Sequence, residues 1–229
     1  MNQGGGRGMM PAMRGRRFVA PVLALAVLPS CAQRSFAPGQ GRGLTTELGA
    51  VPLGIEVAER PQWKVGDRFV YRRGGVLRIE QAVVEAGDGG FVLEEALSRL
   101  RTRMGPSFEQ VGQESPDDPW LAKELAPGDW QLAFPLWPGK QWACEFLLKT
   151  PGDAAMPILA KYVCDRSEEV ETPAGRFKCL RIWRRAQPML EGRRFLDQVA
   201  LTWYAPELGY FVRRLEDGVV TELESYVRQ

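Results

Sequence analysis

The stretch AKYVCDRSEEVETPAGRFKCLRIWRR, residues 160–185, carries a strand–turn–strand signal. Apolar and polar residues alternate over residues 160–171 and again over residues 176–185, which is the period-two pattern of half-buried strands. Between the two runs, Thr172-Pro173-Ala174-Gly175 combines a proline of fixed φ with a permissive glycine, as tight turns require. The sequence therefore predicts an antiparallel hairpin.

The same alternation recurs on both sides of this hairpin. The best helical candidate is residues 119–125, with Asp118 as the N-cap, and no helix long enough for a parallel crossover separates the strands. We therefore expect a mainly β chain: an antiparallel half-barrel or barrel-like sheet of eight to ten strands with at most one or two short helices. The other expected strands are residues 68–72, 76–86, 91–96, 130–134, 142–148, 195–204, 210–215 and 219–226.

Residues 1–30 have a different character. A basic start at residues 14–17 precedes an apolar run at residues 18–28. This is the layout of a secretory signal peptide, and the run is much shorter than the ~20 residues of a transmembrane helix. We expect residues 1–30 to be removed. The true start is left open among Met1, Met9, Met10 and Met13.

The end of this leader, Leu28-Pro29-Ser30-Cys31, resembles the lipobox of bacterial lipoproteins, although Pro29 stands where that family has a small residue. The resemblance implies that Cys31 carries diacylglycerol and palmitate and anchors the protein to a membrane. By similarity to enteric lipoprotein sorting, Ala32 implies the outer membrane, with the protein facing the periplasm.

Composition divides the exported part of the chain at about residue 60. Residues 31–60 are rich in Gly and Pro and predict a flexible tether, whereas residues 61–229 contain all seven Trp and predict one β domain. Removing the leader takes away four arginines and no acid, so the formal charge falls from +2 to −2. Without a clustered basic face, we expect no nucleic-acid partner.

Three motifs together carry a family resemblance: Trp63-Lys64-Val65-Gly66-Asp67 with Tyr71, then residues 172–177, then residues 203–209. They resemble an uncharacterised family of bacterial periplasmic domains related to the half-barrel lipoprotein carriers of the LolA and LolB types. The resemblance implies a curved antiparallel sheet with an apolar concavity and the binding of a lipid or another apolar ligand. It supplies no catalytic residues.

The sequence contains no histidine, which removes the commonest general base and the usual zinc ligand. Neither a nucleophile elbow nor a phosphate-binding glycine loop is present. We therefore expect a non-catalytic protein without a metal or cofactor. The enzymatic alternative is a carboxylate-based hydrolase whose two acids come from distant strands.

Three cysteines remain beyond Cys31. If residues 151–157 join two antiparallel strands centred on Ala154, Cys144 and Cys164 become direct cross-strand neighbours at near-bridging distance. This predicts a disulfide between them, with a Cys164–Cys179 bridge as the second choice. A third interpretation makes all three cysteines small core residues.

Aromatic and basic residues supply the functional hypothesis. Trp130, Trp142, Trp183 and Trp203 lie on or beside expected strands, where they either fill the core or line an apolar ligand pocket. We expect an envelope lipoprotein that binds a lipid or another apolar ligand, with docking to another envelope protein as the alternative. Paired arginines are either scattered solvated charge or a rim for anionic lipid headgroups: Arg72-Arg73, Arg184-Arg185, Arg193-Arg194 and Arg213-Arg214.

Overall fold

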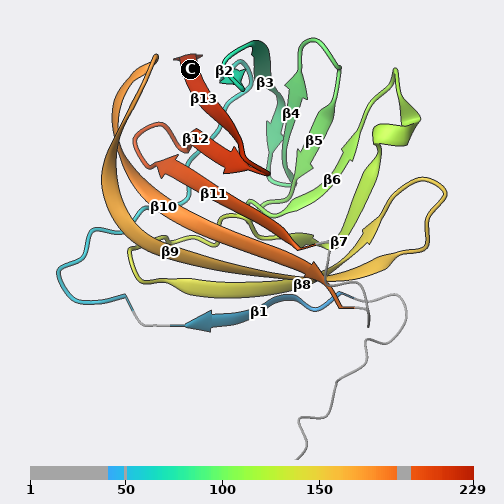
Figure 1. Ribbon diagram of the computed structural model, residues 1–229, viewed down its shortest axis with the longest axis horizontal. Helices are drawn as coiled ribbons and strands as arrows, with labels where there is room; N and C mark the ends of the chain where they lie inside the picture. Colours follow the sequence, from blue (N-terminus) through green and yellow to red (C-terminus); the bar gives the residue numbers. More distant parts are fainter. Residues whose placement is uncertain (1–40, 49–50, 190–196) are drawn as a thin grey trace, which may run out of the picture. The chain divides into compact units, whose positions relative to one another are not determined.

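The computed structural model describes residues 41–48, 51–189 and 197–229. Over these residues the chain forms thirteen antiparallel strands and one short 3₁₀ helix, η1. From β2 to β13 each strand pairs with the next, and β13 pairs with β2, so these twelve strands close into an up-and-down barrel (Figure 1). The elements are β1 (Gly43–Leu48), β2 (Arg68–Arg73), β3 (Leu77–Gly87), β4 (Gly90–Glu95), β5 (Arg101–Met104), β6 (Gln110–Glu114), η1 (Pro119–Leu121), β7 (Lys123–Asp129), β8 (Gln141–Lys149), β9 (Met156–Thr172), β10 (Gly175–Pro188), β11 (Gln198–Ala205), β12 (Tyr210–Glu216) and β13 (Val219–Val227).

The mainly β, antiparallel class is confirmed, but the expected eight to ten strands and the half-barrel are wrong in detail. Four strands are missing from the expectation. Apart from β1, these are β5, β6 and β7, which are short or contain Gly and Pro, so their alternation is masked. In residues 130–134, where a strand is expected, apolar and polar residues alternate but no strand forms. The expected helix shortens to η1, where Asp118 accepts a hydrogen bond from the Trp120 N–H as its N-cap.

Strand β1 lies within residues 31–60, where the sequence predicts a flexible tether. It pairs with β8 from Gly43 opposite Glu145 to Leu48 opposite Gln141, beyond the point where β7 leaves β8. Ala58 is also buried, and it forms an isolated bridge with Leu136. Unpaired backbone groups on β8 favour such an added strand. The expected signal peptide and Cys31 lie outside the described residues.

Glycine-containing turns join the strands where the sequence predicts hairpins. Gly74 and Gly75, between β2 and β3, both have positive φ, and so do Asp217 and Gly218, between β12 and β13. Two consecutive positive φ values match the right-handed twist of the flanking strands. The predicted turn at Pro173 joins β9 to β10.

Because the strands run alternately up and down, the connections fall at two ends of the barrel. We call the end with the β9–β10 and β11–β12 turns the motif end, and the end with the β2–β3, β4–β5 and β6–β7 connections the mouth end. Aromatic rings fill the interior toward the motif end: Trp63 lies 4.4 Å from Phe91 and 4.7 Å from Tyr210, centroid to centroid. Phe69 and Phe108 complete this group, which we call the aromatic plug.

Two of the three resemblance motifs meet at the motif end. The Trp63 indole N–H donates to the Gly209 carbonyl at 3.0 Å, and the Tyr71 hydroxyl donates to the Phe211 carbonyl at 2.9 Å. Asp67 is fully buried and accepts hydrogen bonds from backbone N–H groups, including that of Gln229 at 2.8 Å. These residues hold the end of the barrel together.

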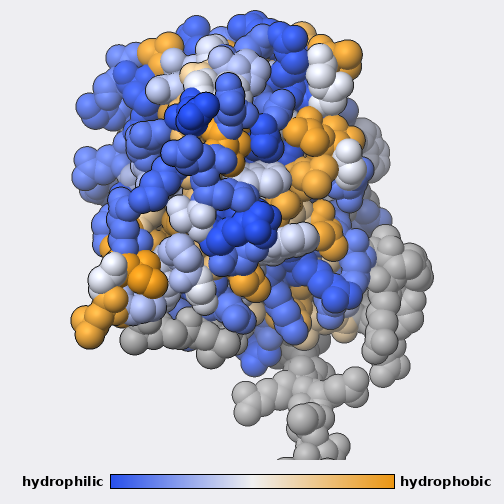
Figure 2. All heavy atoms as spheres, turned by 60° about the vertical axis from the view of Figure 1, so that its left-hand side comes forward, coloured by the Kyte–Doolittle hydropathy of each residue, from blue (hydrophilic) through white to orange (hydrophobic). Residues whose placement is uncertain are grey.

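The surface differs from the interior. Figure 2 shows one face on which hydrophilic residues dominate and hydrophobic residues form smaller groups between them. Within the described part of the chain, no helix has the length and apolar character needed to cross a bilayer.

Candidate functional site: an amphipathic cavity

A cavity of about 740 Å³ opens at the mouth end of the barrel. Its lining comes from strands around most of the barrel, from β2 to β12, and includes Gln131 from the β7–β8 connection. Period-two alternation places every second residue of these strands inside. The cavity therefore arises from the closed barrel and not from a single loop.

One side of the cavity is apolar. On β8, Phe146 and Leu148 point inward, and Met156 and Ile158 follow on the neighbouring strand β9. Leu125 on β7 extends this surface, which we call the apolar wall. The wall offers a surface for a hydrocarbon group.

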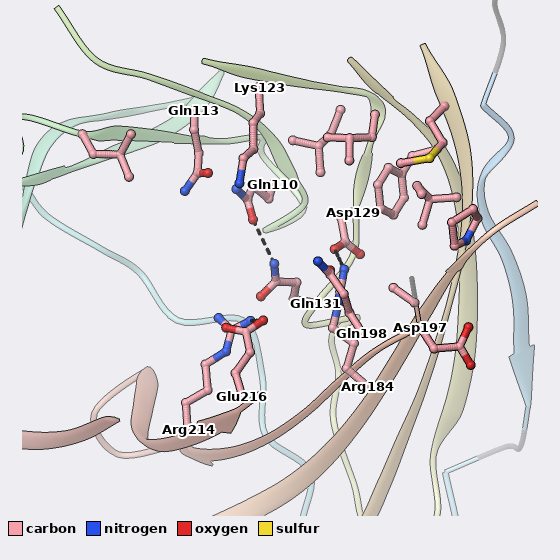
Figure 3. Close-up of a pocket in the computed structure, with 18 of the residues that line it drawn as sticks. Gln110, Gln113, Lys123, Asp129, Gln131, Arg184, Asp197, Gln198, Arg214 and Glu216 are labelled. Carbon is pink, nitrogen blue, oxygen red and sulfur yellow. Dashed lines mark hydrogen bonds and ion pairs between the residues drawn. The ribbon is translucent and has the colours of Figure 1, made fainter. Parts of the chain in front are cut away.

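The opposite side is polar, as Figure 3 shows. The Gln131 amide donates to the Gln110 side-chain oxygen at 2.8 Å, and Arg214 donates to Glu216 at 3.1 Å. Figure 3 shows these side chains directed into the same space, Gln110 from β6, Gln131 from the β7–β8 connection, and Arg214 and Glu216 from β12. Hydrogen-bond donors and acceptors are thus concentrated opposite the apolar wall.

Asp129 forms the centre of a buried network at the base of the cavity. Arg184 donates to one oxygen of Asp129 at 2.9 Å and to the Tyr162 hydroxyl at 3.0 Å. The Tyr162 hydroxyl donates to the other oxygen of Asp129, and the Cys144 thiol approaches that oxygen at 3.4 Å. Asp129 is only 1% exposed, so these contacts replace water around its carboxylate.

The electrostatics of this network keep its donors protonated. Burial, and then the charge of Asp129, raises the pKa values of the Tyr162 phenol and the Cys144 thiol above their ordinary values. Burial opposes the charge on Arg184, but Tyr162 and Asp129 outweigh burial and raise the pKa of the guanidinium. Arg184 therefore presents a permanent positive charge at the base of the cavity.

A second, smaller cavity of about 160 Å³ lies deeper in the barrel, between the polar residues at the base of the open cavity, which we call the polar layer, and the aromatic plug. Gln110, Gln131, Arg184 and Arg214 line both cavities. The polar layer therefore separates the open cavity from the aromatic interior.

Basic residues also line the wider part of the cavity. Arg73 and Lys123 contribute to its lining, and within the described ranges neither forms an ion pair. One arginine from each of three predicted pairs, Arg73, Arg184 and Arg214, thus lines one cavity. Of the two expected arrangements, scattered charge or a common rim, these three arginines therefore show the common one. The fourth pair, Arg193-Arg194, lies outside the described residues.

None of the four tryptophans proposed as ligand contacts lines the open cavity. Trp142 is buried and stacks on Tyr162 with centroids 5.1 Å apart, and Trp130 packs against the same core. Trp183 is 42% exposed beside Arg181, and Trp203 donates to Glu168. Two of them pack in the core, and the other two lie beside charged residues, so none is placed to contact a ligand in this cavity.

The predicted disulfide between Cys144 and Cys164 is also wrong. Cys144 lies opposite Ala160 and Cys164 opposite Ile182, and all three described cysteines are buried free thiols. The turn between β8 and β9 is centred two residues before Ala154, and this shift moves the partner of Cys144 by four residues. The second choice fails as well, since Cys179 lies opposite Glu168.

Sequence reasoning missed Asp129, Gln110 and Gln131. Asp129 ends a strand that contains Pro127 and Gly128, so its position carried no strand signal.

Among the described residues, no group of three or more Cys, Asp or Glu side chains is arranged to hold a metal ion.

No protein-family model and no curated protein sequence matches this chain. Among solved structures it is similar to the hypothetical lipoprotein YmcC of Escherichia coli K12, with a TM-score of 0.47 and 8% identity over 73% of this chain and 89% of that one. A protein from Bacteroides fragilis, described as exported and YmcC-like in fold, gives a TM-score of 0.40 and 13% identity over 75% and 100%.

A protein from Parabacteroides distasonis, described as a lipoprotein, gives a TM-score of 0.41 and 13% identity over 75% of this chain and 100% of that one. With TM-scores below 0.5 and identities of at most 13%, these likenesses establish neither the fold nor the function of this chain. The resemblance to half-barrel carriers stays a prediction.

Proposed function

We propose that this chain is an envelope lipoprotein, anchored through Cys31, that binds an amphiphile with an anionic headgroup in the cavity at the mouth end. The bound molecule belongs to the lipid class, and no reaction is carried out on it. The observation that supports this function most strongly is the division of one cavity into an apolar wall and a basic, polar side.

The two sides match the two parts of such a ligand. Phe146, Leu148 and Met156 would contact an acyl chain, while Arg73 and Lys123 would lie near the headgroup. The volume of about 740 Å³ lies within the roughly 300–1,000 Å³ typical of small-molecule sites. An apolar lining with a few placed polar groups is the usual composition of such sites.

The carboxylates of the cavity support binding in preference to hydrolysis. Asp129 is paired with Arg184, Glu216 with Arg214 and Asp197 with Arg185. A carboxylate hydrolase needs two acids that face one substrate, whereas each of these three carboxylates contacts an arginine.

The location in the envelope rests on the sequence. The basic start, the apolar run and Cys31 form an export signal with a lipidation site, and Ala32 favours the outer membrane over the inner one. The domain would then face the periplasm.

Native mass spectrometry of the full chain purified from membranes tests the binding. After exchange into a volatile buffer with mild detergent, wild-type protein should retain a lipid-sized mass that organic extraction identifies as an anionic lipid. Leu148→Trp, which places a large ring in the cavity, should lose this mass.

The matched control is Val199→Trp, because Val199 is 47% exposed and does not line the cavity. This variant should keep the bound mass. Equal occupancy in wild type and Leu148→Trp, or no bound mass in any variant, would refute lipid binding in the cavity.

A further inference from the structure

Exposed apolar side chains concentrate on neighbouring connections at the mouth end. Apart from Leu53, the three most exposed large hydrophobic residues of the described chain are Val76 at 88%, Leu97 at 79% and Trp120 at 74%. They lie in the β2–β3, β4–β5 and β6–β7 connections respectively. Leu77 and Leu121, beside two of them, are exposed as well. We call these five residues the apolar rim.

The rim surrounds part of the opening through which the cavity is reached. Arg73 immediately precedes the β2–β3 turn, Leu100 follows Leu97, and Lys123 follows η1, and all three line the cavity. Isolated exposed hydrophobic residues are common on protein surfaces, but here three of the four most exposed large hydrophobic residues of the described chain lie at one opening. Their placement therefore indicates a contact surface.

The direction of β1 shows where the chain enters the fold. Gly43 lies opposite Glu145 in an antiparallel pair, so the residues before Gly43 run toward Lys149, the mouth end of β8. At Gly41 the chain is still tightly packed, because a Cβ built there would lie 2.8 Å from the Cα of Phe146. The chain thus enters the barrel from the side of the mouth.

This entry point limits the distance between the mouth and the anchor. Gly41 is the tenth residue after Cys31, and a fully extended chain spans at most about 36 Å over ten residues. A bilayer that held acylated Cys31 would therefore be within reach of the mouth end.

We infer that the apolar rim docks on the bilayer that holds the anchor, so that the cavity opens toward the lipid. The inference rests on the proposed anchoring at Cys31 and on the lipid-binding cavity. Tryptophan is well suited to the membrane–water boundary, where Trp120 would lie with Leu97 and Val76. Arg73 and Lys123 would lie at headgroup level and favour anionic lipids.

Site-specific fluorescence tests the docking. Full-length protein carrying Leu97→Cys is labelled with the environment-sensitive fluorophore NBD and reconstituted with vesicles of phosphatidylethanolamine and phosphatidylglycerol. The three described native thiols are buried, so labelling goes to the new site. Nitroxide-labelled lipid should quench the probe about two-fold or more, because docked apolar side chains reach about 5–10 Å into the interface.

Two controls use exposed hydrophobic positions away from the mouth. Val65→Cys lies toward the motif end and Trp183→Cys on the outer surface of β10, and probes at both positions should stay unquenched. Adding Trp120→Ser and Val76→Ser to the Leu97→Cys protein should reduce the quenching, because two other rim contacts are lost.

Equal quenching at all three positions, or none at Leu97→Cys, would overturn the docking. The docking would also be overturned if labelled lipid did not quench the Leu97→Cys probe but an added envelope protein shielded it from solvent. That result would assign the rim to a protein partner. Lipid occupancy measured on the same samples separates the two proposals: occupancy without quenching removes docking alone, and quenching without occupancy removes ligand binding alone.

Discussion

The two ends of the barrel are built from the same strands, but one end is filled with side chains and the other is open. Toward the motif end, the aromatic plug fills the interior and the Trp63 N–H bond to Gly209 fastens the chain around it. Toward the mouth end, the same strands leave an open cavity, and buried charges replace the aromatic rings. The filled end supplies stability, and the open end leaves room for the proposed ligand.

Truncating the plug should have the largest effect on folding. Phe69→Ala removes a fully buried ring that contacts Trp63 and Tyr210, and should lower the free energy of unfolding by about 3–5 kcal/mol. Leu148→Ala enlarges a cavity that already exists and should cost about 1 kcal/mol. Urea denaturation of the two variants measures the difference, and equal losses would contradict the contrast between the ends.

Breaking the network at the base of the cavity should come next. Asp129→Asn removes the charge that balances Arg184 and should cost about 3 kcal/mol, since it leaves a buried cation unpaired. Asp129→Asn combined with Arg184→Gln should recover part of that loss, and a double-mutant cycle in urea measures the coupling. Additive losses would show that the ion pair does not organise the mouth end.

The buried thiols should make the protein sensitive to alkali. Burial raises the pKa values of Cys164 and Cys179 from 9.0 to about 12. Because the folded pKa is the higher one, the stability is fully present below pH 9 and falls as the pH rises from 9 toward 12. The slope should be about 1.4 kcal/mol per pH unit for each thiol.

Chemical denaturation between pH 8 and 11 measures this slope, and Cys179→Ala should reduce it relative to wild type. The Cys144, Cys164 and Cys179 thiols should also resist a water-soluble thiol reagent until the protein unfolds. Rapid labelling of the native protein would contradict their burial.

The smallest expected effect concerns headgroup preference. Arg73→Ala with Lys123→Ala should weaken binding of an anionic lipid relative to a zwitterionic one by about 1 kcal/mol, or roughly five-fold, and less at high salt. Their side chains add little to folding, so stability should stay within about 0.5 kcal/mol of wild type. Arg176→Ala, an exposed cation at the motif end, is the control and should leave the preference unchanged.

The same division explains what the sequence could predict. Turns with Gly and Pro, such as the one at Pro173, and strands with clear alternation, such as β8 to β10, follow from local chemistry. Closure of the barrel depends on pairing between β2 and β13, which lie at opposite ends of the folded chain, and no local pattern records it.

The cavity was harder to predict than the fold. Its apolar wall comes from ordinary core-type residues such as Phe146 and Ile158, which resemble any buried strand position. Asp129 ends β7 and Gln131 lies in the irregular segment that follows, and only the folded barrel brings them to Arg184 on β10 and Gln110 on β6. The paired arginines were the one usable signal, because three of the pairs lie near strand ends at the mouth.

Photo-crosslinking with an anionic phospholipid that carries a diazirine on its acyl chain tests lipid binding in the cavity most directly. In the full-length protein, mass spectrometry should find cross-links on the apolar wall, at Leu148, Met156 or Ile158, and Leu148→Trp should abolish them. Cross-links confined to the outer surface around Trp183 and Val199, or equal labelling of both variants, would contradict it.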